Sequence, residues 1–129
     1  MKRAYLYTIA IFLFGCKQVN LPDEVSAIMP SIPSEIDYNL HVKQILSDKC
    51  FTCHGPDAKK QKAGLRLDLP AVALSKVTES GLKAIYPGKI SQSEMVYRIL
   101  SDDPNYRMPE PSSHLTLTAY EKSSACKMD

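Results

Sequence analysis

The pentapeptide Cys50-Phe51-Thr52-Cys53-His54 decides how the rest of the sequence is interpreted. Two cysteines separated by two residues, with a histidine directly after the second, form the C-x-x-C-H pattern that attaches c-type haem. The thiols of Cys50 and Cys53 would add to the two haem vinyl groups, and the His54 imidazole would bind the iron on the proximal side. The pattern therefore predicts one covalently attached haem c.

Three other interpretations of these cysteines stay open. A structural zinc ion takes four ligands, usually in two pairs, and the sequence has no second C-x-x-C. Thiol redox chemistry at C-x-x-C accompanies a βαβ pattern, which the sequence lacks. A pair of disulfides would suit four cysteines in an exported chain. The spacing, with a histidine beside the second cysteine, favours haem over all three.

A helix is predicted to deliver the two cysteines. Asp37 suits an N-cap position, and apolar residues recur after it with helical spacing, at Tyr38, Val42, Ile45 and Leu46. We expect this helix to run from about Tyr38 through Lys49 and into the motif. The tripeptide Gly55-Pro56-Asp57 then ends it.

Length and composition describe one small domain. The chain has 129 residues, of which 44% are hydrophobic and 23% charged, so a second catalytic domain, wholesale disorder and a polytopic membrane protein are all disfavoured. It contains no Trp and only three Phe. A small core with so few large rings is thin, and such domains are usually completed by a staple, metal or cofactor.

The first fifteen residues are a targeting signal. Lys2 and Arg3 precede a short apolar run, which is too short for a membrane span. The sequence Leu13-Phe14-Gly15-Cys16 then resembles the lipobox of bacterial lipoproteins, in which the cysteine becomes the lipidated N-terminus. An ordinary signal peptide is the alternative. We expect an exported protein anchored through Cys16 on the periplasmic side of a bacterial membrane. By resemblance to lipoprotein sorting in Gram-negative bacteria, Lys17 in place of an Asp after the cysteine favours the outer membrane over the inner one.

The charge balance argues against nucleic acid as a partner. Removal of residues 1–15 takes away two of the 16 basic residues and none of the 14 acidic ones, so 14 of each sign remain. Phosphate-backbone binding needs a basic surface. The net positive charge of the whole chain is a property of its targeting signal.

Residues 16–35 are expected to form a tether between the anchor and the domain. This segment holds Pro22, Pro30 and Pro33 and no sustained hydrophobic period. The alternative is an N-terminal segment that packs on the domain. The predicted organisation is thus a signal at 1–15, a tether at 16–35 and a haem domain at 36–129.

The iron needs a sixth ligand if it is to carry electrons without binding small molecules. After cleavage the chain offers Met29, Met95, Met108, Met128, His41 and His114. Met95 falls on the apolar face of a helix expected over Ser91–Ser101, which the capping box Ser91-Gln92-Ser93-Glu94 would open. Core packing is therefore its expected role.

Met108 is the preferred distal ligand. The sequence Arg107-Met108-Pro109-Glu110-Pro111 places it in a loop stiffened by two prolines, which lowers the entropy lost when a ligand is held in place. An open sixth position, or ligation by one of the two histidines, remains the alternative.

Several short motifs in order resemble the planctomycete-type cytochrome c domain, over about residues 36–120. They include Ile36-Asp37-Tyr38-Asn39, the C-x-x-C-H pentapeptide followed by Gly55-Pro56-Asp57, Ala63-Gly64-Leu65-Arg66-Leu67-Asp68 and Arg107-Met108-Pro109. The resemblance implies an all-α, class I-like fold around one haem. It also implies thioether attachment at Cys50 and Cys53, with His54 and Met108 as axial ligands. Glu110 departs from the family, which usually has a proline there.

The C-terminus departs further from the family. Thr118 and Glu121 predict a capping box, but residues 123–129 supply no apolar stripe for the long helix that the family packs across the cysteine-bearing helix. We therefore expect an incomplete C-terminal helix in a truncated chain, with a native short form as the alternative. Cys126 would be an incidental thiol.

The function that follows is one-electron transfer between redox proteins whose identity the sequence does not give. The alternatives are a haem sensor or peroxidase-like module with an open sixth site, and a non-redox truncated module. Lys59, Lys60 and Lys62 lie close to the motif. They fit a solvated loop better than a docking patch for an acidic partner.

Overall fold

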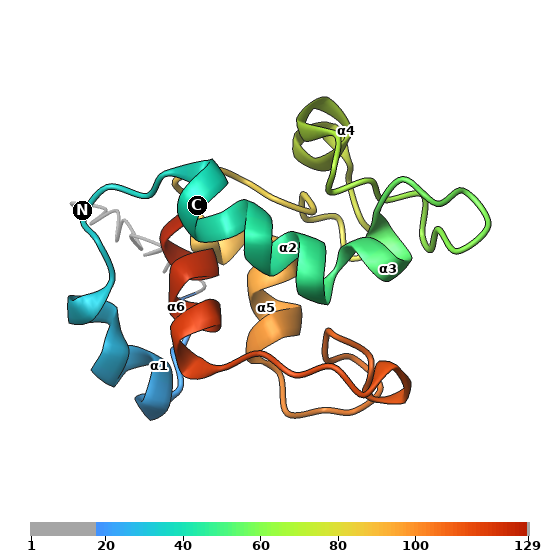
Figure 1. Cartoon of the computed structure of the whole chain (residues 1–129). Helices are drawn as coiled ribbons and strands as arrows, with labels where there is room; N and C mark the ends of the chain where they lie inside the picture. The colour runs from blue at the N-terminus through green and yellow to red at the C-terminus, as the bar shows by residue number, and fades with distance from the viewer. Residues whose placement is uncertain (1–17, 129) are drawn as a thin grey trace, which may run out of the picture.

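The chain folds into a small bundle of short helices (Figure 1). The computed structural model describes residues 18–128, and within them there is no strand, only two isolated β-bridges. The helices are α1 Asp23–Ile28, η1 Met29–Ser31, η2 Tyr38–Val42, α2 Lys43–Lys49, α3 Phe51–His54, α4 Pro70–Ser75, η3 Ile90–Gln92, α5 Glu94–Leu100, η4 Pro111–Ser113 and α6 Ala119–Met128. The all-α prediction is confirmed. Over the described residues, no helix combines the length and apolar character needed to cross a membrane.

The predicted cysteine-bearing helix is present but interrupted. Asp37 is its N-cap, since the Asp37 carboxylate accepts the Leu40 N–H at 2.9 Å and the Asp37 N–H donates to His41 Nδ1 at 3.0 Å. The first turn is a π-helix, η2, which continues into α2. At Cys50 the backbone leaves helical geometry, with φ −124° and ψ −33°, before α3 begins. The break between α2 and α3 therefore falls at the first cysteine of the motif.

Two aliphatic clusters form the core. One joins η2 and α2 to α4 and to two non-helical segments of the chain. Its buried residues are Val42, Leu46, Leu67, Ala73 and Ile85. The other joins α5 to α6, through Val96, Ile99, Ala125 and Cys126. Met95 contacts both clusters, as its predicted core role requires. No aromatic side chain belongs to either buried set, which agrees with the scarcity of rings in the sequence.

The structure corrects the expectation for the C-terminus. The predicted capping box is formed: Thr118 N–H donates to Glu121 Oε2 at 2.7 Å, and Glu121 N–H to Thr118 Oγ1 at 3.2 Å. However, α6 continues for ten residues and packs against α1, α5 and η2. Its buried residues are Ser123, Ser124, Ala125 and Cys126. Because small side chains let helices approach closely, this helix packs without the large apolar stripe that the sequence lacks.

The tether expected over residues 16–35 is also corrected in part. Helix α1 lies along α6 (Figure 1), with Val25 fully buried and Ile32 only 3% exposed. Lys122 pairs with Glu24 at 2.8 Å, and Lys127 Nζ donates to the Ile32 carbonyl at 2.8 Å. Residues 22–32 therefore follow the alternative prediction, an N-terminal segment that packs on the domain. The signal at 1–15 and Cys16 lie outside the described residues.

Two adjacent serines on α6 give a matched test of this packing. Both are fully buried, but Ser123 Oγ donates to the carbonyls of Ala119 and Val25, at 2.7 and 3.2 Å, whereas Ser124 Oγ has no hydrogen-bond partner among the described residues. A buried hydroxyl without a bond destabilises a protein by about 1–3 kcal/mol. Ser124→Ala is therefore expected to raise the free energy of unfolding by about 1 kcal/mol, measured by urea denaturation.

Ser123→Ala is the control for that variant. This variant removes a hydroxyl that is hydrogen-bonded, whereas Ser124→Ala removes one that is not. It should lower the free energy of unfolding by about 1 kcal/mol. The same sign of change in both variants would show that the two hydroxyls do not differ in this way.

Candidate haem site

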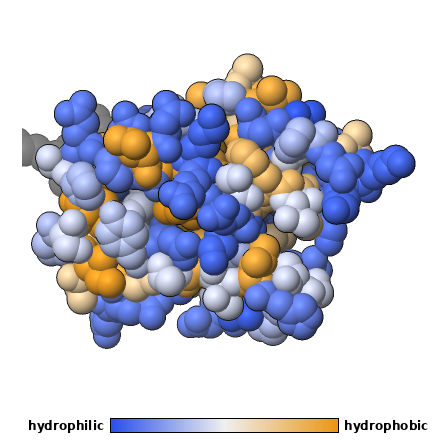
Figure 2. Space-filling view, in the orientation of Figure 1, coloured by the Kyte–Doolittle hydropathy of each residue, from blue (hydrophilic) through white to orange (hydrophobic). Residues whose placement is uncertain are grey.

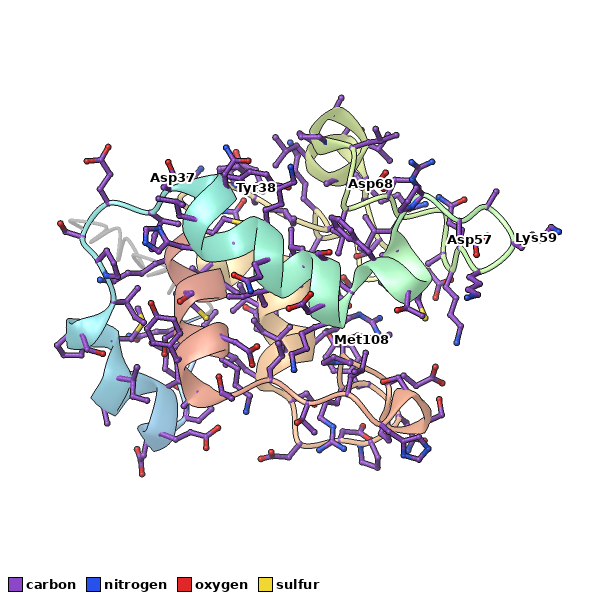
Figure 3. All side chains as sticks on the ribbon, in the orientation of Figure 1. Asp37, Tyr38, Asp57, Lys59, Asp68 and Met108 are labelled. Carbon is purple, nitrogen blue, oxygen red and sulfur yellow. The ribbon has the colours of Figure 1, made fainter. Side chains whose placement is uncertain are left out.

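One cavity brings together the motif and the predicted distal ligand. Its volume is about 340 Å³, within the range of roughly 300–1,000 Å³ typical of ligand pockets. Cys50, Cys53 and His54 line it on one side and Met108 on the other, and its apolar walls come from Ala63, Leu65, Leu67, Val77, Ala84, Ile99 and Leu115. Figure 3 shows Met108 below the α2–α3 junction, on the loop that leads toward α6.

Backbone hydrogen bonds hold the motif rigidly. The N–H groups of Cys53 and His54 both donate to the Cys50 carbonyl, at 3.1 and 2.8 Å. The loop after the motif returns to α3, where Lys62 N–H donates to the Cys53 carbonyl at 2.9 Å and Leu67 N–H to the His54 carbonyl at 2.8 Å. Because both carbonyls are fixed, the side chains of the second cysteine and the histidine are presented to the cavity in a defined orientation.

The electrostatics of Cys50 disfavour thiol redox chemistry. Burial, followed by the negative charges of Glu121 and Cys53, raises the pKa of the Cys50 thiol to about 11. Reactive redox cysteines have lowered pKa values, because the thiolate is the nucleophile. Between residues 18 and 128, His, Cys, Asp and Glu form no group of three or more that could hold a metal ion.

His54 is suited to bind iron in its neutral form. Burial lowers the pKa of this imidazole, although the backbone carbonyls of Lys62 and Leu65 oppose the effect. Its Nδ1 is buried and has no hydrogen-bond partner among the described residues. Neutral imidazole is the form that ligates metals.

Met108 is held by the helix behind it and by the loop opposite. Met108 N–H donates to the Arg98 carbonyl at 3.0 Å, and the Met108–Pro109 peptide bond is cis. Across the cavity opening, Lys62 Nζ pairs with Glu110 at 2.8 Å, which links the loop after His54 to the loop after Met108. The departure from the family pattern at Glu110 thus provides a contact between the two walls.

Of the other candidate ligands, only Met95 lines the same cavity. Met29, Met128, His41 and His114 are not among its lining residues, and His114 is exposed, in left-handed backbone geometry with φ 58°. Met95 does line the cavity, from α5, in addition to packing in the core. The sequence assigned Met95 to the core alone. The cavity therefore contains two thioethers, of which only Met108 lies in a loop.

The three lysines near the motif lie in a solvated loop. In Figure 2 the projecting loop after α3 is strongly hydrophilic, and Figure 3 shows Asp57 and Lys59 at that end of the molecule. Lys60 pairs with Asp57 at 3.9 Å, and Lys62 with Glu110. All three lysines are exposed or half-buried and two have acidic partners, so this loop is not a strongly basic patch.

Sequence analysis missed the role of Glu94 at the cavity wall. The predicted capping box with Ser91 is wrong: α5 begins at Glu94, its N-cap is Ser93, and no side chain caps it. Instead the Glu94 carboxylate is buried beside the cavity and binds Ser80, Arg98 and Tyr106. A charged residue at the start of a helix resembles a cap in sequence, and only tertiary structure shows these partners.

Comparison with known proteins gives a match to a family that covers the motif and Met108. No curated protein and no solved structure matches the chain. Residues 50–112 match the sequence model of the family described as Planctomycete cytochrome C, and this stretch includes the C-x-x-C-H motif, most of the residues that line the cavity and Met108. The chain therefore carries a planctomycete-type cytochrome c domain.

Proposed function

We propose that this domain transfers single electrons through one haem c, attached to Cys50 and Cys53 and ligated by His54 and Met108. The observation that supports this most strongly is that all four residues line one apolar cavity, although Met108 is far from the motif in sequence. A cytochrome c family assignment suggests electron transfer through c-type haem. The haem would supply an iron that alternates between its ferric and ferrous states.

The residues of the chain then have separate tasks. The two thiols fix the cofactor covalently, so it cannot dissociate during redox cycling. Neutral His54 would donate a nitrogen lone pair, and the Met108 thioether, a neutral soft ligand, would favour the ferrous state and raise the potential. The aliphatic walls exclude water, which further disfavours the more highly charged ferric state. Because both ligands are held by the backbone, little rearrangement should accompany reduction.

We also propose that the domain acts outside the cytoplasm, anchored through lipid on Cys16. The support is the Lys-Arg and apolar signal followed by the lipobox-like Leu13-Phe14-Gly15-Cys16. Metabolic labelling with a fatty acid, with and without Cys16→Ala, tests the anchor.

The haem assignment has a direct test. Protein expressed with haem-attachment machinery should retain one haem per chain under denaturing conditions, and its pyridine haemochrome spectrum should show two thioether bonds. The variant Cys50→Ala/Cys53→Ala should retain none. Cys126→Ala, which removes a buried cysteine outside the cavity, is the control and should keep full occupancy. Absence of covalent haem from the unmodified protein would contradict the proposal.

A further inference from the structure

Glu94 is a buried carboxylate whose two oxygens are both used. Its residue is 3% exposed, at the first position of α5. Oε1 accepts from Arg98 Nε and from Tyr106 Oη, each at 2.9 Å, and Oε2 accepts from Ser80 Oγ at 2.7 Å. A buried charge requires such compensation. Three donors from three different segments therefore converge on one side chain of the cavity wall.

Arg98 lies on α5 with Glu94, whereas Ser80 and Tyr106 belong to two loops beside the cavity. Ser80 follows Val77, Thr78 and Glu79, which line it on one side. Tyr106 lies two residues before Met108, in the loop that leaves the end of α5 (Figure 1). Glu94 thus connects both loops to a helix, and of its two loop partners only Tyr106 lies on the segment that carries Met108.

Arg98 strengthens the connection to Met108. Its guanidinium lies over the Tyr106 ring, 4.4 Å from the centroid, and its Nη1 donates to the Tyr106 carbonyl at 3.4 Å. The Arg98 carbonyl accepts the Met108 N–H at 3.0 Å. Tyr106 and Met108 are therefore both attached to one turn of α5, and Glu94 fixes the hydroxyl end of Tyr106 and the guanidinium of Arg98 at the same oxygen.

We propose that Glu94 is a positioning residue, which holds the Met108 thioether at the sixth coordination position by anchoring Tyr106. The inference rests on the proposed function, because it assumes that Met108 is the distal ligand. Groups that orient metal ligands commonly change metal affinity or activity by about 10–100-fold when they are removed. Loosening the Tyr106 anchor should let Met108 leave the iron more often, so external ligands compete better.

Two single-atom variants separate positioning from general stability. Tyr106→Phe and Ser80→Ala each remove one hydroxyl that donates to the Glu94 carboxylate, but only the first lies on the Met108 loop. We expect carbon monoxide to bind reduced Tyr106→Phe about 10-fold more tightly than the unmodified holoprotein. Ser80→Ala should stay within about 2-fold. Haem content and thermal midpoints, measured on the same samples, establish that both variants are folded and loaded.

A third variant connects the effect to Glu94 itself. Glu94→Gln should also increase the affinity for carbon monoxide, and the increase should not add to that of Tyr106→Phe in the double variant, since both changes disrupt one contact. Equal affinities in Tyr106→Phe and Ser80→Ala would overturn the inference and leave Met108 ligation intact. If the unmodified reduced protein binds carbon monoxide as readily as Met108→Leu, the ligand assignment fails, and with it the inference.

Discussion

Met108→Leu is expected to lower the reduction potential of the haem-loaded protein by on the order of 0.1 V, because axial ligands move haem potentials over about 0.8 V. Leucine preserves the volume of methionine and removes only its sulfur, so the fold should be kept. The iron then loses the ligand that stabilises its ferrous state. A spectroelectrochemical titration measures the potential, and rapid binding of carbon monoxide to the reduced variant reports the open position.

Met95→Leu is the matched control, since the cavity contains a second thioether. Met95 lines the cavity from α5 and packs against both core clusters. Its replacement by leucine should leave the potential and the carbon monoxide affinity close to those of the unmodified protein. If Met95→Leu shifts the potential and Met108→Leu does not, the distal ligand is the helical methionine and the loop assignment is wrong.

The candidate site could be predicted because its parts are carried by local patterns. Cys50, Cys53 and His54 are adjacent in sequence and their spacing has a chemical meaning, so no tertiary information is needed to group them. Met108 could be chosen over Met95 because prolines distinguish a stiff loop from a helix face. The structure adds that the motif and Met108 line one cavity, which no periodicity could show.

The packing of the two chain ends could not be predicted, because its signal is weak in sequence. Helix α6 buries Ser123 and Ser124, residues usually found on the surface. Its partner α1 has a single fully buried residue, Val25, between prolines that suggest an extended tether. Each segment lacks an amphipathic pattern by itself. Their stability comes from contact with each other, and single-sequence periodicity does not record such contacts.

Glu94 was missed for a related reason. Its position three residues after Ser91 predicts a capping box, which the structure does not form. Glu94 instead binds Arg98 of its own helix at 2.9 Å, and its other two partners are brought to it by loops. The functional value of a buried carboxylate depends on which segments it joins, and that depends on the tertiary fold.

Gly55→Ala is expected to destabilise the domain by about 1–3 kcal/mol, the usual cost of overpacking. A Cβ atom at Gly55 would clash with the Phe51 carbonyl oxygen and would lie 2.7 Å from the Phe51 Cβ. Its φ of −120° is open to any residue, so the cause is close approach of the backbone and not conformational freedom. Since the contact is with the first residue of α3, the helix or the turn must move, and His54 lies between them.

The same variant should therefore lower haem incorporation as well as stability. The turn at Gly55 directs the loop whose Leu67 N–H binds the His54 carbonyl at 2.8 Å, so a displaced turn also misplaces the proximal histidine. Haem-to-protein ratio and urea denaturation measure the two effects. Pro56→Ala, at the exposed next position, should change stability by no more than about 0.5 kcal/mol. If Gly55→Ala has the stability and haem content of the unmodified protein, α3 and the turn can move apart without cost. The close contact between Gly55 and Phe51 then does not fix the His54 imidazole.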